Sequence, residues 1–392
     1  MYSLLLAVIY LAFISLGLPD SLLGAGWPSM HAEFGVSLSS AGIVSLIISG
    51  STIVSSLLSE RLTRKLGAKY VTLISVVVSS ASLFGFSMSK SFVLLCILAV
   101  PFGLAAGSID AALNNYVALH YNSRHMSWLH CFWGVGAIVS PYIMSISIAH
   151  STWRDGYSTV SIIQIGIAVV LAAALPLWRV NKDPSGPSGE GGKTLGIKAA
   201  FRIPGVPAIL FGFLGYCAAE WTCMLWAASY LIETRHVTEE RAAAFASLVF
   251  IGLTVGRFLA GFVSEKVGDR NMIRTGTAIV AVGLVLIAIP AVPEFFSLAG
   301  FVIIGFGCAP IYPSIIHSTP HNFGKTASQA IIGMQMAFAY VGSMFAPAIL
   351  GFISSSTGLW IMPIYLLAFF TLMIVMTEIA FRRAGRNKES GS

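Results

Sequence analysis

Residues 57–69 read LLSERLTRKLGAK, and residues 261–271 read GFVSEKVGDRN. In both stretches an apolar run ends at a glutamate, Glu60 or Glu265, and basic residues follow within a short turn. The two glutamates lie about 205 positions apart in a chain of 392 residues. An acidic and basic turn that returns half a chain later indicates that the protein is built from two related halves.

Long apolar runs separate such turns along the whole sequence. Hydrophobic residues make up 56% of the chain and charged residues only 10%, and the mean hydropathy is +0.83. A water-soluble domain of this composition would expose a very large apolar surface, so lipid must be the solvent. A span needs roughly twenty apolar residues. The sequence therefore predicts an all-α integral membrane protein with twelve transmembrane helices, at residues 3–29, 38–60, 69–88, 92–119, 126–148, 156–179, 204–233, 240–264, 272–289, 294–318, 326–353 and 359–382.

Basic residues gather on one side of the membrane if every predicted helix crosses it. Positively charged connections stay in the cytoplasm, so we expect a multi-pass protein of the cell membrane with both termini cytoplasmic. The net charge of +7 is then explained without a nucleic-acid partner. The opposite side holds only Lys90, Arg154, Arg235 and Arg241. The basic residues of the predicted cytoplasmic side are Arg61, Arg64, Lys65, Lys69, Arg124, Arg179, Lys182, Lys193, Lys198, Arg202, Lys266, Arg270, Arg274, Lys325, Arg382, Arg383, Arg386 and Lys388.

The sequence lacks the motifs of several enzyme classes. A P-loop, GxSxG and HExxH are absent, which argues against an ATP-driven pump and against serine or zinc hydrolases. We therefore expect no enzyme activity, no metal site, and no cofactor other than a coupling proton or sodium ion. The cysteines fall inside predicted helices without a CxxC pair and are interpreted as packing residues: Cys96, Cys131, Cys217, Cys223 and Cys308.

One segment has the composition of a linker. Residues 181–193 read NKDPSGPSGEGGK and fall between the sixth and seventh predicted helices. The expected organisation is a six-helix bundle over residues 1–180, a cytoplasmic linker over 181–201 and a second six-helix bundle over 202–392.

Two further similarities between the halves of the sequence support an internal repeat. Gly136 precedes Pro141 by the same interval as Gly342 precedes Pro347. Asp20 and Glu220 lie 200 positions apart, in the first helix of each predicted half. Pseudo-symmetric halves are typical of transporters that work by alternating access.

These features resemble the major facilitator superfamily over essentially the whole chain. The chain departs from the family pattern at Ser56 and Thr63, where glycine is usual, and in using glutamate where aspartate is usual. The arginine common in helix 4 of proton-driven exporters is absent. Four stretches are similar to the fucose-permease-like sugar symporters: residues 108–117 (SIDAALNNYV), 130–141 (HCFWGVGAIVSP), 216–231 (YCAAEWTCMLWAASYL) and 305–316 (GFGCAPIYPSII). The resemblance implies that helices 1, 4, 7 and 10 line a central cavity.

Three carboxylates within predicted spans stand out: Asp20, Asp110 and Glu220. Ionisable groups in hydrocarbon cost from about 3 kcal/mol upward, so each needs a reason. They lie on three of the four helices that the resemblance assigns to the cavity. A carboxylate in such a cavity can take up a proton on one side and release it on the other. We expect Asp20 or Asp110 to couple transport to an ion gradient and Glu220 to bind solute; the alternative for each is a hydrogen bond at a helix interface.

Local patterns favour functional roles for the first two acids. Asp20 follows Pro19, and the resulting helix break frees carbonyl groups that can help to hold a cation. Asn114 is one turn beyond Asp110 on the same face of a helix. A carboxylate and an amide presented together suit sugar hydroxyl groups, which both donate and accept hydrogen bonds.

Other polar and aromatic residues of the predicted helices are candidate solute contacts. Polar residues taken singly more often make hydrogen bonds between helices than ligand contacts. The polar candidates are Asn115, His130, Gln164, His317, Gln329 and Gln335, and the candidate stacking platforms for sugar rings are Trp133, Trp221, Trp226 and Tyr340. For Trp27 and Trp153 we prefer an interfacial aromatic belt.

The two charged turns have a role by resemblance. It implies that Glu60 with Arg64, and Glu265 with Arg270, belong to latches that hold the halves together in one state and release them in the other. Arg257, two turns before Glu265, is a candidate partner. The alternative is ordinary cytoplasmic positive charge.

The sequence thus predicts a proton- or sodium-coupled importer of a small-molecule substrate, a sugar, that works as a monomer in the lipid bilayer. An exporter of drugs or metabolites on the same scaffold is the main alternative. A membrane receptor or scaffold without transport is disfavoured because soluble extensions are almost absent.

Overall fold

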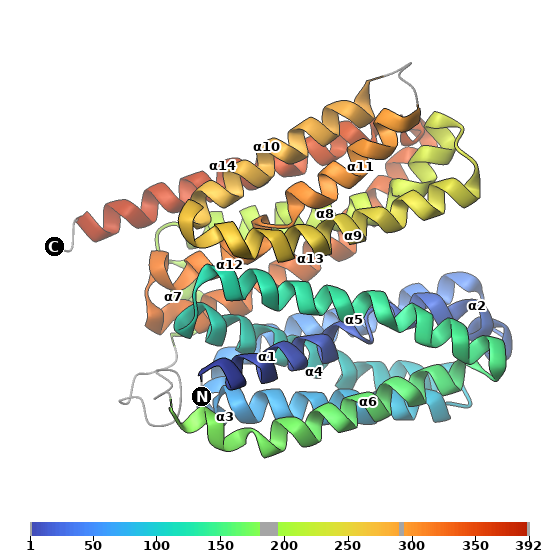
Figure 1. Ribbon diagram of the computed structural model, residues 1–392, viewed down its shortest axis with the longest axis horizontal. Coiled ribbons are helices and arrows are strands. Elements are labelled where there is room, and N and C mark those ends of the chain that lie inside the picture. Colours follow the sequence, from blue (N-terminus) through green and yellow to red (C-terminus); the bar gives the residue numbers. More distant parts are fainter. Residues whose placement is uncertain (1, 181–194, 290–293, 390–392) are drawn as a thin grey trace. The chain divides into compact units, whose positions relative to one another are not determined.

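The computed structural model describes residues 2–180, 195–289 and 294–389, and these residues are almost entirely helical (Figure 1). They form two compact units. Unit 1 comprises residues 1–116 and 132–195, and unit 2 comprises residues 117–131 and 196–392. Most of the predicted linker, including Lys182 and Lys193, lies outside the described residues, so the bundle boundaries at 180 and 202 stay predictions.

Unit 1 contains a first helix that is broken in two. The sequence predicts one span over 3–29 with a break at Pro19, and the helix stops at Gly17 and resumes at Leu22 because Pro19 has no N–H to donate. The elements that contribute to this unit are α1 (Tyr2–Gly17), α2 (Leu22–Phe34), η1 (Leu38–Ser40), α3 (Ala41–Met88), α4 (Phe92–His120), α5 (Ser123–His150), α6 (Trp153–Ala173) and η2 (Leu175–Val180).

The second and third predicted spans belong to one long helical segment. They form α3, in which Gly67 alone departs from helical geometry, with φ 77° and ψ 153°. Glycine adopts a positive φ without strain, so the chain changes direction there instead of forming a loop. The spans predicted at 38–60 and 69–88 therefore meet at a kink.

Unit 2 repeats the pattern of long apolar helices and also contains a broken one. The span predicted at 294–318 is divided after Cys308, where Pro310 cannot donate a backbone hydrogen bond. Its elements are α7 (Ile197–Phe201), α8 (Val206–Arg235), α9 (Glu239–Val267), α10 (Asp269–Ala288), α11 (Glu294–Cys308), α12 (Ile311–Phe323), α13 (Lys325–Thr357), η3 (Leu359–Ile361) and α14 (Met362–Glu389).

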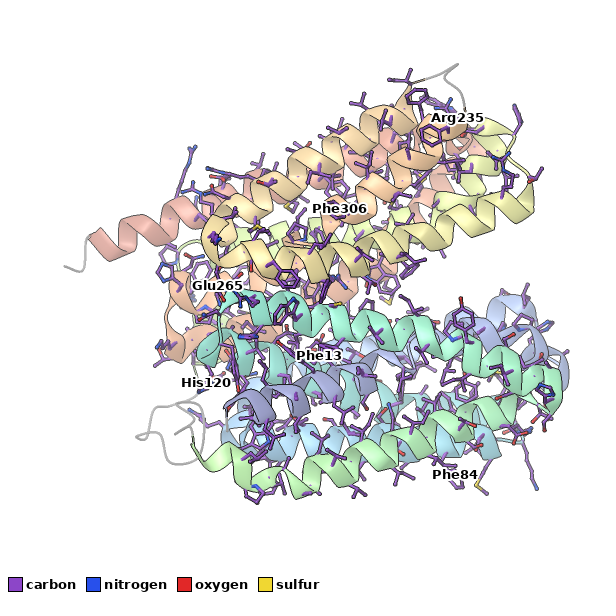
Figure 2. All side chains as sticks on the ribbon, viewed as in Figure 1. Phe13, Phe84, His120, Arg235, Glu265 and Phe306 are labelled. Atoms are coloured by element: carbon purple, nitrogen blue, oxygen red, sulfur yellow. The ribbon has the colours of Figure 1, made fainter. Side chains whose placement is uncertain are left out.

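Ten described segments are long and apolar enough to cross a bilayer. One of them, Leu38–Met88, is 51 residues long and contains the kink at Gly67, so it holds two spans. With α9, which is 29 residues long, these segments account for the twelve predicted helices. Large apolar side chains remain exposed on both units, as Phe84 and Phe306 illustrate (Figure 2). Such surfaces are stable in lipid rather than in water.

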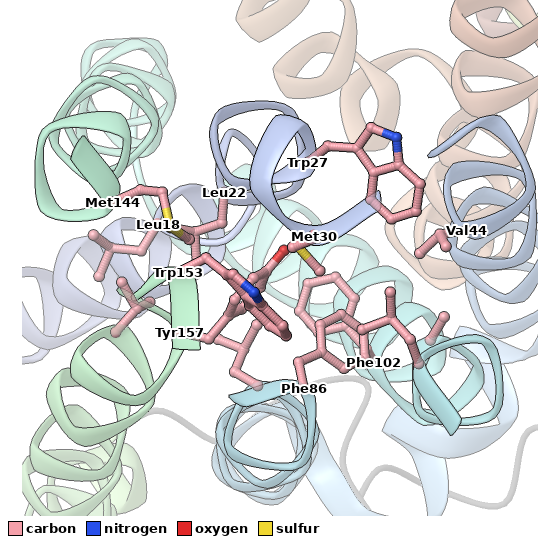
Figure 3. Close-up of a cluster of buried hydrophobic side chains, with 14 residues drawn as sticks. Leu18, Leu22, Trp27, Met30, Val44, Phe86, Phe102, Met144, Trp153 and Tyr157 are labelled. Atoms are coloured by element: carbon pink, nitrogen blue, oxygen red, sulfur yellow. The ribbon is translucent and has the colours of Figure 1, made fainter. Parts of the chain in front are cut away.

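Unit 1 has a buried apolar cluster in which two tryptophans take part (Figure 3). Trp27 and Trp153 are each 3% exposed. The Trp27 indole N–H donates to the Leu38 carbonyl oxygen at 2.6 Å, and that of Trp153 donates to Glu33 at 2.7 Å. The interpretation of both residues as an interfacial belt is therefore wrong, because they are core residues with satisfied N–H groups.

Candidate functional site

The break in the first helix brings Asp20 into contact with α5. The Asp20 N–H donates to the Gly17 carbonyl oxygen at 3.3 Å, which closes a tight turn after α1. The carboxylate of Asp20 is exposed on unit 1 and accepts a hydrogen bond from Trp133 Nε1 at 2.8 Å. Two residues predicted for separate roles, coupling and stacking, are thus joined through the indole N–H.

Two glycines allow α1 and α5 to approach closely enough for this contact. A Cβ atom at Gly17 would lie 2.1 Å from the Trp133 carbonyl oxygen, and one at Gly136 would lie 2.4 Å from the Ile14 carbonyl oxygen. Only small residues permit such backbone contact between membrane helices. Backbone packing therefore fixes the position of Trp133 beside Asp20.

Asp110 and Asn114 form the pair that their spacing predicts. Asn114 Nδ2 donates to Asp110 Oδ1 at 2.7 Å and to the Asp110 carbonyl oxygen at 2.9 Å. Asp110 is 6% exposed, and Asn114 and the adjacent Asn115 are buried as well. The pair presents carboxylate and amide atoms from one face of α4.

Gln164 compensates for the proline in the first helix. In an unbroken helix the Ser15 carbonyl group would accept a hydrogen bond from residue 19, but Pro19 has no N–H. Instead Gln164 Nε2 donates to the Ser15 carbonyl oxygen at 2.7 Å, and Ser79 Oγ donates to Gln164 Oε1 at 3.1 Å. Gln164 makes the hydrogen bonds between helices that were the alternative to a ligand role.

In unit 2, Glu220 is held in a buried ion pair. Arg257 Nη2 lies 3.3 Å from Glu220 Oε1, and both side chains are almost fully buried. The Tyr216 hydroxyl lies 2.7 Å from the same carboxylate oxygen and 2.9 Å from the Cys308 carbonyl oxygen. The partner proposed for Arg257 from the sequence was Glu265, but the structure pairs it with Glu220, because α8 and α9 pack side by side while Glu265 lies about 12 Å further along α9.

His130 belongs to the same unit and lies against the start of α12. Its ring centroid is 4.6 Å from that of Tyr312, which is 6.1 Å from the ring of Tyr216. The Tyr312 hydroxyl donates to Met336 Sδ at 3.3 Å. His130 is 4% exposed and packs on an aromatic ring, and its role as a solute contact stays a prediction.

The remaining candidates of α8 and α13 have different surroundings. Trp226 Nε1 donates to the Pro347 carbonyl oxygen at 2.9 Å, and its ring covers Gly351, so its contacts join α8 to α13. Gln335 Oε1 accepts from Thr319 Oγ1 at 3.1 Å. Gln329 is buried, Tyr340 is half-buried and Trp221 is 39% exposed. Trp221 therefore remains the most accessible predicted platform on α8.

Glu60, Glu265 and Arg270 of the two charged turns contact residues outside their own turns. Glu60 accepts a hydrogen bond from the Leu195 N–H at 2.8 Å. Glu265 (Figure 2) pairs with Arg124, whose Nε lies 3.4 Å from Glu265 Oε1. Arg270 pairs with Glu378 of α14 at 2.5 Å. Arg64 is half-buried on α3.

Some contacting residues were not predicted. Asp269 lies 2.7 Å from His317 Nδ1 and accepts a hydrogen bond from Ser123 Oγ at 2.7 Å. His317 is one of the polar candidates from the sequence, but no local pattern marks Asp269 and Ser123, since the three residues come from different helices. Tyr216 could have been found, because it precedes Glu220 by four residues and so shares its helix face.

The sequence matches the family model described as Major Facilitator Superfamily over residues 9–252 and 209–391. It is 24% identical over 363 residues to the cis,cis-muconate transport protein of Acinetobacter baylyi, with 88% of this chain and 86% of that protein covered.

Two solved structures share the fold. A crystal structure of FucP in the outward conformation aligns with a TM-score of 0.78 at 14% identity, over 96% of this chain and 98% of the other. The human organic anion transporter MFSD10 aligns with a TM-score of 0.78 at 12% identity, over 96% and 98%. At these identities the likeness concerns the fold.

Proposed function

The chain belongs to the major facilitator superfamily and is a membrane transporter, and we propose that it takes up a sugar together with a proton or a sodium ion. The two units would alternate access to a solute site, with the chain acting as a monomer in the cell membrane and both termini in the cytoplasm. One solved FucP structure is described as the Escherichia coli fucose:proton symporter, which supports this solute class and this type of coupling.

The observation that carries the proposal is the buried pair of Asp110 and Asn114. A carboxylate within a membrane span needs a functional reason, and its amide neighbour adds N–H donors and a further acceptor oxygen. Sugar hydroxyl groups match this combination because each both donates and accepts hydrogen bonds.

Asp20 is our second candidate for ion coupling. Its carboxylate is exposed and stays bonded to an N–H donor, Trp133 Nε1, in either protonation state. The adjacent helix break leaves backbone carbonyl groups that can contribute to a cation site. Asp20 can therefore exchange a proton or a sodium ion without losing its position.

One charged contact at the turns fits the role of a latch. Glu265 with Arg124 is a partly exposed pair that can break and re-form at modest free-energy cost. We propose that this pair stabilises one conformational state of the transport cycle. The pair of Arg270 and Glu378 joins α10 to α14 within the second half of the chain and therefore cannot hold the two halves together.

Counterflow in proteoliposomes tests the sugar proposal. Vesicles that hold the purified protein are preloaded with one sugar at a time, and exchange with labelled sugar is measured. Gradient-driven uptake is then measured with either a proton or a sodium gradient. Exchange with at least one sugar and uptake driven by one of the two gradients are expected. Absence of exchange with every sugar would reject the proposal.

An exporter of metabolites is the second candidate. The muconate transport protein and the organic anion transporter are named for other solutes on the same fold. Exchange of such compounds, without exchange of sugars, would favour this alternative.

A further inference from the structure

Unit 2 contains a complete ion pair within its membrane-spanning helices. Arg257 of α9 is 3% exposed and Glu220 of α8 is 5% exposed. Charged side chains are unfavourable in a bilayer, and an apolar pair of similar volume is often as stable as a buried ion pair. Helix packing alone therefore does not account for the pair.

The two charges are less tightly joined than the rest of the cluster. Arg257 Nη2 lies 3.3 Å from Glu220 Oε1, whereas charge-assisted hydrogen bonds usually measure about 2.7–2.9 Å. The Tyr216 hydroxyl is 2.7 Å from the same oxygen and belongs to the same helix as Glu220. Glu220 would therefore keep one partner if Arg257 turned to another anion.

The backbone beside this cluster is irregular. Cys308 is the last residue of α11, and its carbonyl oxygen lies 2.9 Å from the Tyr216 hydroxyl. Pro310 follows before α12 begins. Broken helices at membrane depth occur where protein buries them or where they line a cavity, and they often carry solute sites. A charged pair, a tyrosine and a helix break thus meet within one unit.

We infer that Arg257 binds a carboxylate group of the transported solute, and that Glu220 occupies this position until it is protonated. The inference rests on the proposed uptake of sugar-like compounds and narrows their class to hydroxylated monocarboxylic acids, such as sugar acids. When Glu220 becomes neutral, the buried guanidinium loses the negative charge of Glu220, and the carboxylate of the solute replaces that charge. One proton and one monovalent anion bind together, so the cluster gains no net charge.

The other ionisable groups around the pair are consistent with this exchange. Glu220 is near Tyr216 and Cys223 of α8 and Cys308 of α11, which are neutral side chains at ordinary pH. His130 of α5 lies within electrostatic reach of Arg257 and packs on Tyr312. Among these described groups Glu220 is the carboxylate that balances Arg257, so its protonation changes the charge that the guanidinium meets.

Three probes separate charge from shape. D-glucose, D-glucuronate and D-glucuronamide share a ring and most hydroxyl groups and differ at C6, where only glucuronate carries a negative charge. The midpoint of thermal unfolding of the full chain in detergent is measured with each probe at about pH 5.5 and about pH 7.5, because a bound ligand stabilises by mass action. Uptake of the labelled probes into proteoliposomes is measured in parallel.

Variants then test the assigned residues. Glu220→Gln mimics the protonated acid and is expected to bind glucuronate equally at both pH values, whereas the natural protein binds it more tightly at the lower pH. Arg257→Gln is expected to weaken glucuronate binding by at least about 30-fold. Because Arg257→Gln leaves Glu220 buried without a counter-charge, the double variant Arg257→Gln/Glu220→Gln serves as the neutral, foldable form and must also lose the preference for glucuronate. Arg202→Gln, which removes an exposed arginine, is the control.

The outcomes are distinguishable. Preference for glucuronate over both neutral probes, lost in the double variant and independent of pH in Glu220→Gln, supports the inference. Binding and uptake of glucose or glucuronamide without a preference for glucuronate would overturn it and leave the proposed sugar uptake standing. Glucuronate binding that persists in the double variant would also overturn it. If no probe binds or is taken up, the inference fails, and the counterflow assay with the panel of sugars decides separately whether the proposed sugar uptake stands.

Discussion

Asp20 and Glu220 occupy equivalent positions in the two units. A Cβ atom at Gly136 of α5 would lie 2.4 Å from the carbonyl oxygen of Ile14, and one at Gly342 of α13 would lie 2.6 Å from that of Leu214. In each unit the acid follows this contact by six residues, Asp20 just beyond the end of α1 and Glu220 within α8. The internal repeat is therefore present in the packing of each unit as well as in the spacing of its residues.

Replacing these packing glycines is expected to destabilise the protein. Gly136→Ala and Gly342→Ala each place a methyl group within 3 Å of a backbone carbonyl oxygen, which cannot move without displacing a helix. We expect a loss of about 1–3 kcal/mol in the free energy of unfolding, measured by thermal unfolding in detergent.

Gly166→Ala is the matched control for these variants. Gly166 lies in α6 and a Cβ atom there would meet nothing within 4 Å. Alanine has the higher helix propensity, so this variant is expected to be as stable as the natural protein or slightly more stable. Equal loss of stability in all three variants would contradict the role of close packing at Gly136 and Gly342.

Asp110→Asn is expected to abolish gradient-driven uptake while the protein stays folded. The new amide keeps a carbonyl oxygen that can accept the hydrogen bond from Asn114, so the local contact survives without the charge. Uptake against a gradient and sugar counterflow are measured in the same proteoliposomes. Uptake equal to that of the natural protein would remove Asp110 from the coupling mechanism.

The arrangement of helices was largely predictable, because the lipid solvent leaves few alternatives. Twelve apolar runs determine the spans, and the repeat of glycine spacings indicates two related halves. Of the two helix breaks, the one at Pro19 was predicted and the one at Pro310 was not. Pro19 and Pro310 both interrupt helices, but Pro101 and Pro141 lie inside continuous ones, so a proline alone does not identify a break.

The partners of charged side chains were the least predictable part of the site. Arg257 pairs with Glu220, which lies 37 positions away in the sequence, and Arg270 pairs with Glu378, which lies 108 positions away. Such pairs depend on how the helices are rotated about their axes. The apolar composition of a helix does not specify that rotation. The pair of Asp110 and Asn114 was predictable because both residues lie on the same helix, one turn apart.

The contact between Arg124 and Glu265 is expected to contribute little to stability. The two side chains are 39% and 35% exposed, and such pairs are usually worth less than about 1 kcal/mol. A double-mutant cycle with Arg124→Gln and Glu265→Gln, measured by thermal unfolding, should give a coupling below that value and a smaller one at high salt. If the contact is a latch, both single variants should change the transport rate in the same direction. A large coupling with unchanged transport would identify a structural pair instead.

Arg154 is expected to stabilise one end of unit 1 in a way that lysine cannot reproduce. Its guanidinium Nη1 donates to the Ser87 and Ser89 carbonyl oxygens at 3.1 and 2.6 Å, where α3 ends, and its Nη2 pairs with Glu33. The same group lies over the Trp153 ring, 4.3 Å from its centroid. A planar group with several donors can satisfy these partners together, whereas the lysine ammonium is a compact charge that cannot stack in this way.

Arg154→Ala should lower the free energy of unfolding by about 1–3 kcal/mol, and Arg154→Lys should recover less than half of that loss. Thermal unfolding of both variants beside Lys90→Ala, which removes an exposed charge, provides the measurement. Full recovery by lysine would show that charge alone, and not the geometry of the guanidinium, holds this end of the unit together.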